Sequence, residues 1–293
     1  MAPGILLAIL AALAFGAALV VTERGLTHQS AYAGARISIL TTTLLLWLPA
    51  PWLFDARVLS SPALAMFAGV GLFFPVLVTL LTFEANRLMG PTIAGTRGSV
   101  APLLALAAAV LFLGETVTVR LLSAAVAVAA GIALLSSHRE AHACRWPGAA
   151  VALPLGAAAL RACAQVLIKA GLTLVPNPFT AALTGYTVSA LAVWLLFLPG
   201  ARATGLAPRT NARARPLQGG GWFMGAGLLN GTAVLAMYGA LSQARLTVVA
   251  PIVAAYPLAT LILSLALGGT ERIGVRLVGG SLLVVAGMVL ILV

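Results

Sequence analysis

Long apolar blocks, each about the length of a membrane-crossing helix, are the feature of this sequence that most restricts its fold. A bilayer core about 30 Å thick needs roughly 20 apolar residues per helix. Transmembrane β-strands are about half as long and alternate polar with apolar residues, which these blocks do not. The sequence therefore predicts an all-α integral membrane protein with ten transmembrane helices, at about 3–22, 31–51, 62–84, 91–113, 119–137, 147–170, 178–198, 219–243, 246–268 and 273–292.

The scarcity of charge argues against a water-soluble fold. Charged residues make up 8% of the chain and hydrophobic ones 61%, whereas an average soluble domain is about 25% charged. The net charge is +11, but most arginines lie between the apolar blocks, where cations meet anionic lipid headgroups. We therefore expect the lipid bilayer, and no nucleic acid, as the partner of these cations. The N-terminus has neither a basic n-region nor a cleavage site, so we expect the first block to be retained as a helix.

Residue patterns typical of enzymes and metal sites are missing from the sequence. Two cysteines, Cys144 and Cys163, are too few for a disulfide framework. No cysteine–histidine cluster has zinc spacing, and no Ser/His/Asp grouping or phosphate-binding loop appears. We expect no enzymatic activity, cofactor or metal, and we keep a membrane enzyme or scaffold as a remaining alternative.

A short joint occurs twice in the sequence. Glu115 lies five residues before Arg120, between the fourth and fifth predicted helices, and Glu271 lies five residues before Arg276, between the ninth and tenth. For both pairs the favoured interpretation is an interfacial staple between helices rather than a ligand site.

Other features recur at nearly the same offset, and they predict an internal repeat. Pro102 corresponds to Pro257 with a shift of one residue, and Gly131 corresponds to Gly287. We therefore predict two copies of one five-helix unit, residues 1–141 and 142–293. Because five is odd, the second copy starts on the opposite side of the membrane, so the copies are inverted around a central cavity. Many secondary transporters have this architecture, with the substrate site at the repeat interface. The glycines, including Gly69, Gly71, Gly279 and Gly280, are also expected to let helices pack closely.

At these residues the chain resembles the drug/metabolite transporter superfamily, and within it the EamA-type ten-helix exporters, among them YddG-like amino-acid exporters. The resemblance rests on "VAPLLALAAAVLFLGE" with Gly131 in the first copy and "AYPLATLILSLALGGTE" with Gly287 in the second, where one residue is inserted before the glutamate. It implies a multi-pass carrier of a bacterial-type inner (plasma) membrane. Such a carrier moves small metabolites, often outward, by alternating access.

Polar side chains inside the apolar blocks are the candidate binding groups, because a charge near mid-membrane costs roughly 3 kcal/mol or more. Arg161 lies in the middle of the sixth block, and Gln165 and Lys169 follow at i+4 and i+8 on the same helix face. Arg161 and Gln165 are predicted to bind the substrate. For Lys169 we favour an interfacial position, reached by its long side chain.

Further candidates are spread over several blocks. Arg97 lies near the start of the fourth block, and Glu84 ends the third, so these two residues are a candidate pair. The remaining candidates carry hydrogen-bonding groups in otherwise apolar blocks: Asn230, Tyr238, Tyr256 and Ser99.

The charge inventory indicates the kind of ligand. Buried Arg161 and Arg97 favour a carboxylate or another anionic group, so we expect an amino acid, aromatic ones included, or a related metabolite. The alternative is a multidrug or organic-cation exporter. Cation exporters of the small multidrug type need a buried carboxylate in the first helix, but the first block has no acid before Glu23 at its end. Glu84 is the one acid near a pathway, so proton coupling and facilitated diffusion both stay open.

Loop charges and the resemblance give opposite orientations. Most loop arginines lie in the odd-numbered loops, above all Arg202, Arg209, Arg213 and Arg215. The positive-inside rule would place the termini outside. The resemblance implies cytoplasmic termini, and that is the orientation we expect.

Overall fold

The computed structural model describes residues 3–29, 31–79, 81–82, 85, 97–136, 152–196, 216–267 and 274–292. Regular structure in these ranges is helical, without a strand, so the all-α prediction is confirmed. The first group of helices is α1 (Pro3–Leu26), α2 (Ala31–Trp47), α3 (Ala50–Leu53), the 3-10 helix η1 (Ala56–Ser60), α4 (Ala63–Phe73), α6 (Ala101–Leu113) and α7 (Val119–Ser136). The second is α8 (Ala152–Leu174), α9 (Pro178–Leu196), α11 (Pro216–Gln243), α12 (Leu246–Ala254), α13 (Tyr256–Ala266) and α14 (Val275–Leu292).

Each of the ten predicted blocks contains a described helix, but the helices differ in length. Seven are long and apolar enough to cross a membrane: α1, α7, α8, α9, α11, the α12–α13 pair and α14. Three apolar helices are shorter, at Ala33–Trp47, Ala63–Thr79 and Ala101–Leu113. The protein is therefore a multi-pass helical membrane protein, while the count of ten crossings stays a prediction.

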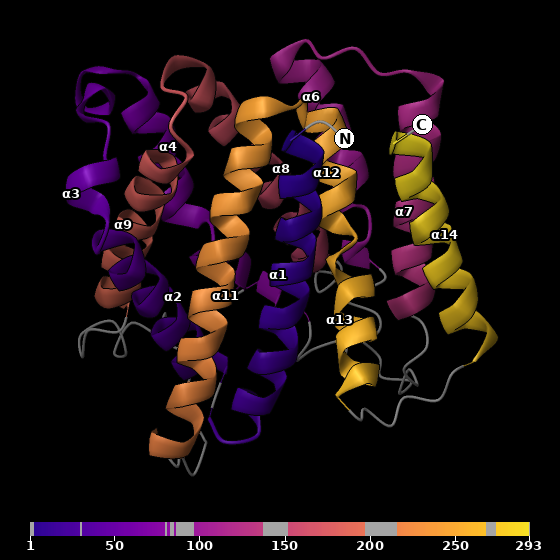
Figure 1. Ribbon diagram of the computed structural model, residues 1–293, viewed down its shortest axis with the longest axis horizontal. Coiled ribbons are helices and arrows are strands. Elements are labelled where there is room, and N and C mark those ends of the chain that lie inside the picture. Colours follow the sequence, from indigo (N-terminus) through magenta and orange to yellow (C-terminus); the bar gives the residue numbers. More distant parts are fainter. Residues whose placement is uncertain are drawn as a thin grey trace.

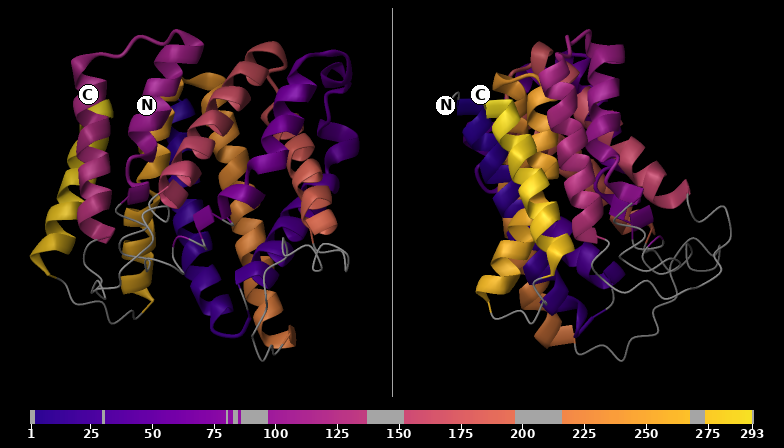
Figure 2. Two further views of the ribbon diagram at one scale, coloured as in Figure 1. Left: turned by 180° about the vertical axis from the view of Figure 1, so that it is seen from behind. Right: turned by 90° about the vertical axis from the view of Figure 1, so that its right-hand side faces the viewer.

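The helices form one bundle whose axes run in roughly the same direction (Figure 1). Helix α1 packs along α11 in the middle, and α7 packs along α14 at one edge. Toward the other edge α2 contacts α11 and α9, and α4 contacts α9 and α8. The first turn of α1 and the last turn of α14 lie at the same end of the bundle (Figure 2). We call this end the terminus end.

The two prolines matched in the sequence occupy equivalent structural positions. Pro102 lies in the first turn of α6, and Pro257 lies in the first turn of α13. Proline has no backbone N–H, so it is tolerated in a first helical turn, whereas farther along a helix it removes a backbone hydrogen bond. At Pro257 the ninth block is accordingly divided into α12 and α13, with Ala255 between them.

Glycines allow α7 and α14 to cross at close range. A Cβ on Gly280 would lie 2.9 Å from the carbonyl oxygen of Gly131, and one on Gly287 would lie 2.8 Å from that of Ala124. Small residues at such crossings let helix backbones approach, so the prediction of close packing is confirmed for Gly280 and for Gly71, which meets Gly185. It is wrong for Gly69 and Gly279, because neither would bring a Cβ within 4 Å of another helix.

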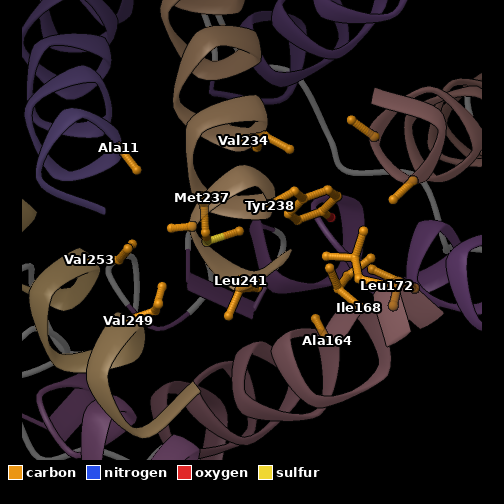
Figure 3. Close-up of a cluster of buried hydrophobic side chains, with 14 of the residues drawn as sticks. Ala11, Ala164, Ile168, Leu172, Val234, Met237, Tyr238, Leu241, Val249 and Val253 are labelled. Atoms are coloured by element: carbon orange, nitrogen blue, oxygen red, sulfur yellow. The ribbon is translucent and has the colours of Figure 1, made fainter. Parts of the chain in front are cut away.

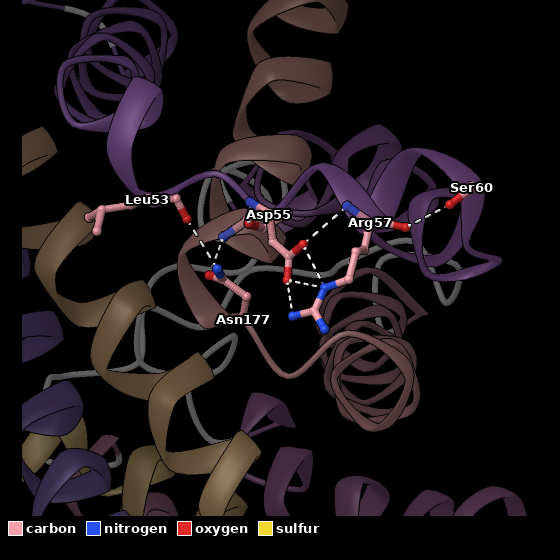
Figure 4. A network of polar contacts seen from close by, with 6 residues as sticks. Leu53, Asp55, Arg57, Ser60 and Asn177 are labelled. Carbon is pink, nitrogen blue, oxygen red and sulfur yellow. Dashed lines mark hydrogen bonds and ion pairs between the residues drawn. The ribbon is translucent and has the colours of Figure 1, made fainter.

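A polar network at the terminus end joins the segment after α3 to the start of α9 (Figure 4). The Asn177 side-chain amide donates to the carbonyl oxygen of Leu53 at 3.0 Å, and the backbone N–H of Asp55 donates to the Thr180 hydroxyl at 2.9 Å. Arg57 forms an ion pair with Asp55 at 2.6 Å. The hydrogen bonds from its guanidinium lower the pKa of the Asp55 carboxyl. This network ties loops from the two predicted copies together.

Candidate functional site

A cavity of about 270 Å³ lies inside the bundle, with walls from α1, α2, α8, α9, α11, α12 and α13. We call it compartment 1. It reaches toward the end of the bundle away from the termini, because Thr22 at the end of α1 and Gly34 at the start of α2 line it. Its position among helices from both halves of the chain makes it the candidate functional site.

Arg161 and Gln165 bring polar groups to this cavity from α8. Both side chains are half-buried. Within the described residues, no protein group forms an ion pair or hydrogen bond with either of them. A guanidinium held among apolar helices can form charge-assisted hydrogen bonds with an anionic ligand.

A second cavity, compartment 2, has a volume of about 290 Å³ and lies between α6, α7, α8, α12 and α13. Arg161, Gln165 and Tyr256 line both cavities, together with Leu19, Thr82 and Val253. These six side chains lie where the two compartments meet, and we call them the partition. The arginine that sequence reasoning placed first is therefore accessible from two sides.

The other predicted site residues fall into two groups. Asn230, Tyr238 and Tyr256 line compartment 1, and Ser99 lines compartment 2. The Asn230 amide also lies 3.4 Å from the Ser38 hydroxyl, a long contact between α11 and α2. These four residues are thus brought around Arg161, although they come from blocks far apart in the sequence.

The predicted pair of Arg97 and Glu84 is not tested by the described part of the structure. Arg97 is half-buried just before α6 and belongs to neither lining as described. Glu84 lies outside the described residues. The predicted Glu84–Arg97 pair therefore stays a prediction.

Sequence reasoning missed the three phenylalanines in the aromatic wall of compartment 1. This wall is formed by Phe15, Phe74, Tyr186, Phe223, Tyr238 and Tyr256. Phe15 meets Tyr256 edge to face, with ring centroids 6.4 Å apart. Apolar rings in an apolar chain give no local signal that would single them out.

Buried apolar side chains from several helices pack together beside compartment 1 (Figure 3). Ile168 and Met237 line the cavity, and beyond them Leu172, Leu241 and Val249 are almost completely buried. We call Leu172, Leu241 and Val249 the apolar plug.

Lys169 lies behind the plug and does not contribute to either cavity lining. Its ammonium donates to the carbonyl oxygens of Leu241 at 2.6 Å and Ala244 at 2.8 Å, at the C-terminal end of α11. A cation at this position satisfies carbonyls that the helix leaves unpaired. The polar stripe predicted on α8 is thus divided between a cavity and a helix cap.

Comparison with known proteins shows a family match for the first half of the chain and a fold likeness for the whole of it. Residues 2–137 match the profile of the EamA-like transporter family. A solved crystal structure, titled only as that of a protein, shares the fold with a TM-score of 0.76 and 17% sequence identity, over 98% of this chain and 95% of the other. No curated protein matches the sequence.

Proposed function

We propose, for a chain whose residues 2–137 belong to the EamA-like transporter family, that it exports small metabolites carrying a carboxylate across a bacterial-type inner membrane. Amino acids, aromatic ones included, are the first candidates. The observation that carries the proposal is the Arg161 guanidinium in the wall of compartment 1, which has no partner among the described residues.

The chemistry of the cavity supports this ligand class. A guanidinium binds a carboxylate with two parallel hydrogen bonds, and burial in an apolar bundle strengthens the attraction. Gln165 and Asn230 add amide groups that can donate to or accept from a polar head, and the aromatic wall fits an apolar side chain. An organic cation would meet the positive charge of Arg161, which disfavours the multidrug alternative.

The packing of the helices supports an inverted repeat and alternating access. The helices of the two halves can be matched in chain order, so that α1 corresponds to α8, α2 to α9 and α4 to α11. Under this matching the α1–α11 contact corresponds to α8–α4, and the α11–α2 contact corresponds to α4–α9. All four pairs are in contact. Two helices that correspond to each other are also in contact in the pairs α2–α9 and α7–α14. The common end of the first and last helices agrees with an even number of crossings (Figure 2). Exchanging the conformations of two such halves would close compartment 1 on one side and open it on the other.

Cytoplasmic termini are part of the proposal. The family resemblance supports this orientation, whereas the distribution of arginines in the loops favours the opposite one. Reporters of cytoplasmic and external location, fused to the C-terminus and to the loop 197–215, test this orientation. An external C-terminus would reverse the direction in which compartment 1 opens.

Transport by purified protein in lipid vesicles tests the function. Labelled amino acids are offered singly, with and without a proton gradient, and organic cations are offered as the rival class. We expect amino-acid flux that Arg161→Ala abolishes and that Arg161→Lys partly retains. Lysine keeps the positive charge but lacks the planar guanidinium that forms two parallel hydrogen bonds with a carboxylate. Arg120→Ala is the matched control, since Arg120 is exposed and lines neither cavity. Cation flux without amino-acid flux, or full transport by Arg161→Ala, would contradict the proposal.

A further inference from the structure

One face of α8 runs past both compartments. Ala157 lines compartment 2, Arg161 lines both, and Ala164 lines compartment 1. The spacing of four and three residues puts these side chains on one stripe of the helix. A ligand whose anionic group is bound by Arg161 can therefore extend along the helix in two directions.

The two compartments have different walls. Compartment 1 presents five aromatic rings besides that of Tyr256 on the partition. Compartment 2 is bounded mainly by small or compact side chains, among them Ala105, Ala157, Ala254, Pro102 and Pro257. Rings favour a flat apolar group, whereas alanines leave room for a short substituent.

The second compartment is at least as large as the first, at about 290 Å³ against 270 Å³. Pockets for drug-sized ligands begin at about 300 Å³, so each compartment alone is close to the size of a small-molecule pocket. A free amino acid has one large substituent next to its carboxylate, so it would occupy compartment 1 and leave compartment 2 to water. Its ammonium group would also lie beside Arg161, where a second positive charge is unfavourable.

We propose that the preferred ligand is an N-acylated amino acid, and that compartment 2 is the subsite for its acyl group. The carbon next to the carboxylate then carries two substituents that diverge from Arg161, the side chain into compartment 1 and the acylated nitrogen into compartment 2. Acylation removes the ammonium charge, so the ligand is a monoanion that matches one guanidinium. Gln165, on the partition, is placed to hydrogen-bond the new amide. This inference rests on the proposed function, because it uses the same carboxylate-binding arginine.

Vesicle uptake of phenylalanine and N-acetylphenylalanine tests the subsite. The unmodified protein should have a KM for the acetylated compound lower by about tenfold, because acetylation removes the ammonium charge beside Arg161 and adds an amide that Gln165 can bind. Ala157→Leu, which fills compartment 2, should raise that KM about tenfold and leave the KM of phenylalanine within about twofold. Ala164→Leu, its counterpart two turns along the same stripe, should impair both solutes.

Each result decides between the two proposals. Uptake of phenylalanine without uptake of, or inhibition by, the acetylated compound would overturn the subsite and leave the proposed function intact. Uptake of neither would overturn the proposed function. Ala254→Leu fills compartment 2 from the opposite wall and repeats the test if Ala157→Leu does not fold. A folded compartment 2 variant that treats both solutes equally would also overturn the subsite.

Discussion

The carboxylate of Glu115 accepts a hydrogen bond from the backbone N–H of Leu246 at 2.8 Å, so the turn after α6 holds the first turn of α12. Its other oxygen accepts from the N–H of Thr247 at 2.9 Å. These are two of the donors that a helix N-terminus leaves without an intrahelical acceptor, and an anion there also suits the helix dipole. The predicted staple therefore exists, but among the described residues no ion pair joins Glu115 to Arg120.

Removing this cap should destabilise the protein. Glu115→Ala leaves both N–H groups without their acceptor, and we expect a loss of about 1–2 kcal/mol. Arg120→Ala should change stability by no more than about 0.5 kcal/mol, because Arg120 is exposed. Reversible unfolding of both variants in detergent measures the difference. Equal losses would show that the sequence-predicted Glu–Arg pair is the staple after all.

Lys169 should stabilise the same turn from the other side. Lys169→Met keeps the length of the side chain and removes the two hydrogen bonds to Leu241 and Ala244. We expect a loss of about 1.5–3 kcal/mol, the range for hydrogen bonds to a charged group.

Because Lys169 and Glu115 act on opposite ends of residues 241–247, their effects should not be additive. The double variant with Glu115→Ala completes a mutant cycle, and the coupling should be at least about 0.5 kcal/mol. A coupling of zero would mean that the two residues stabilise the bundle independently.

The crossing of α7 and α14 should be sensitive to one glycine and insensitive to its neighbour. A Cβ at Gly280 meets the Gly131 carbonyl oxygen at 2.9 Å and Leu135 at 3.0 Å, so Gly280→Ala should cost about 1–3 kcal/mol through overpacking. Gly279→Ala has open space and should be neutral or stabilising by up to about 1 kcal/mol, since glycine is a poor helix former. Thermal unfolding of the pair checks this, and similar melting temperatures would place the helices further apart.

Water should reach compartment 1 from the end of the bundle opposite to the termini. In a background with Cys144→Ser and Cys163→Ser, a thiol at Ser38→Cys, which lines the cavity, should react with an impermeant reagent added on that side. A thiol at Leu241→Cys, in the apolar plug, should stay unreactive, because Leu241 is completely buried. Labelling at position 241 at the rate of position 38 would contradict a closed plug.

The sequence by itself determined the helical membrane fold. In lipid every backbone polar group needs an internal partner, so each long apolar block must be a helix. Hydropathy is therefore a local signal that needs no knowledge of the neighbours. The prolines Pro102 and Pro257 act locally in the same way, and both begin helices as their chemistry requires.

Only the tertiary structure decided what each polar side chain does. Arg161 and Lys169 share one face of α8, yet Arg161 faces two cavities while Lys169 caps α11. Glu115 has a partner 131 residues away rather than Arg120 five residues away. The physical reason is that a polar group in a bundle is satisfied by whichever helix packs beside it, and that neighbour is chosen by long-range packing. Spacing along one helix fixes the direction of a side chain, but it does not fix what lies in that direction.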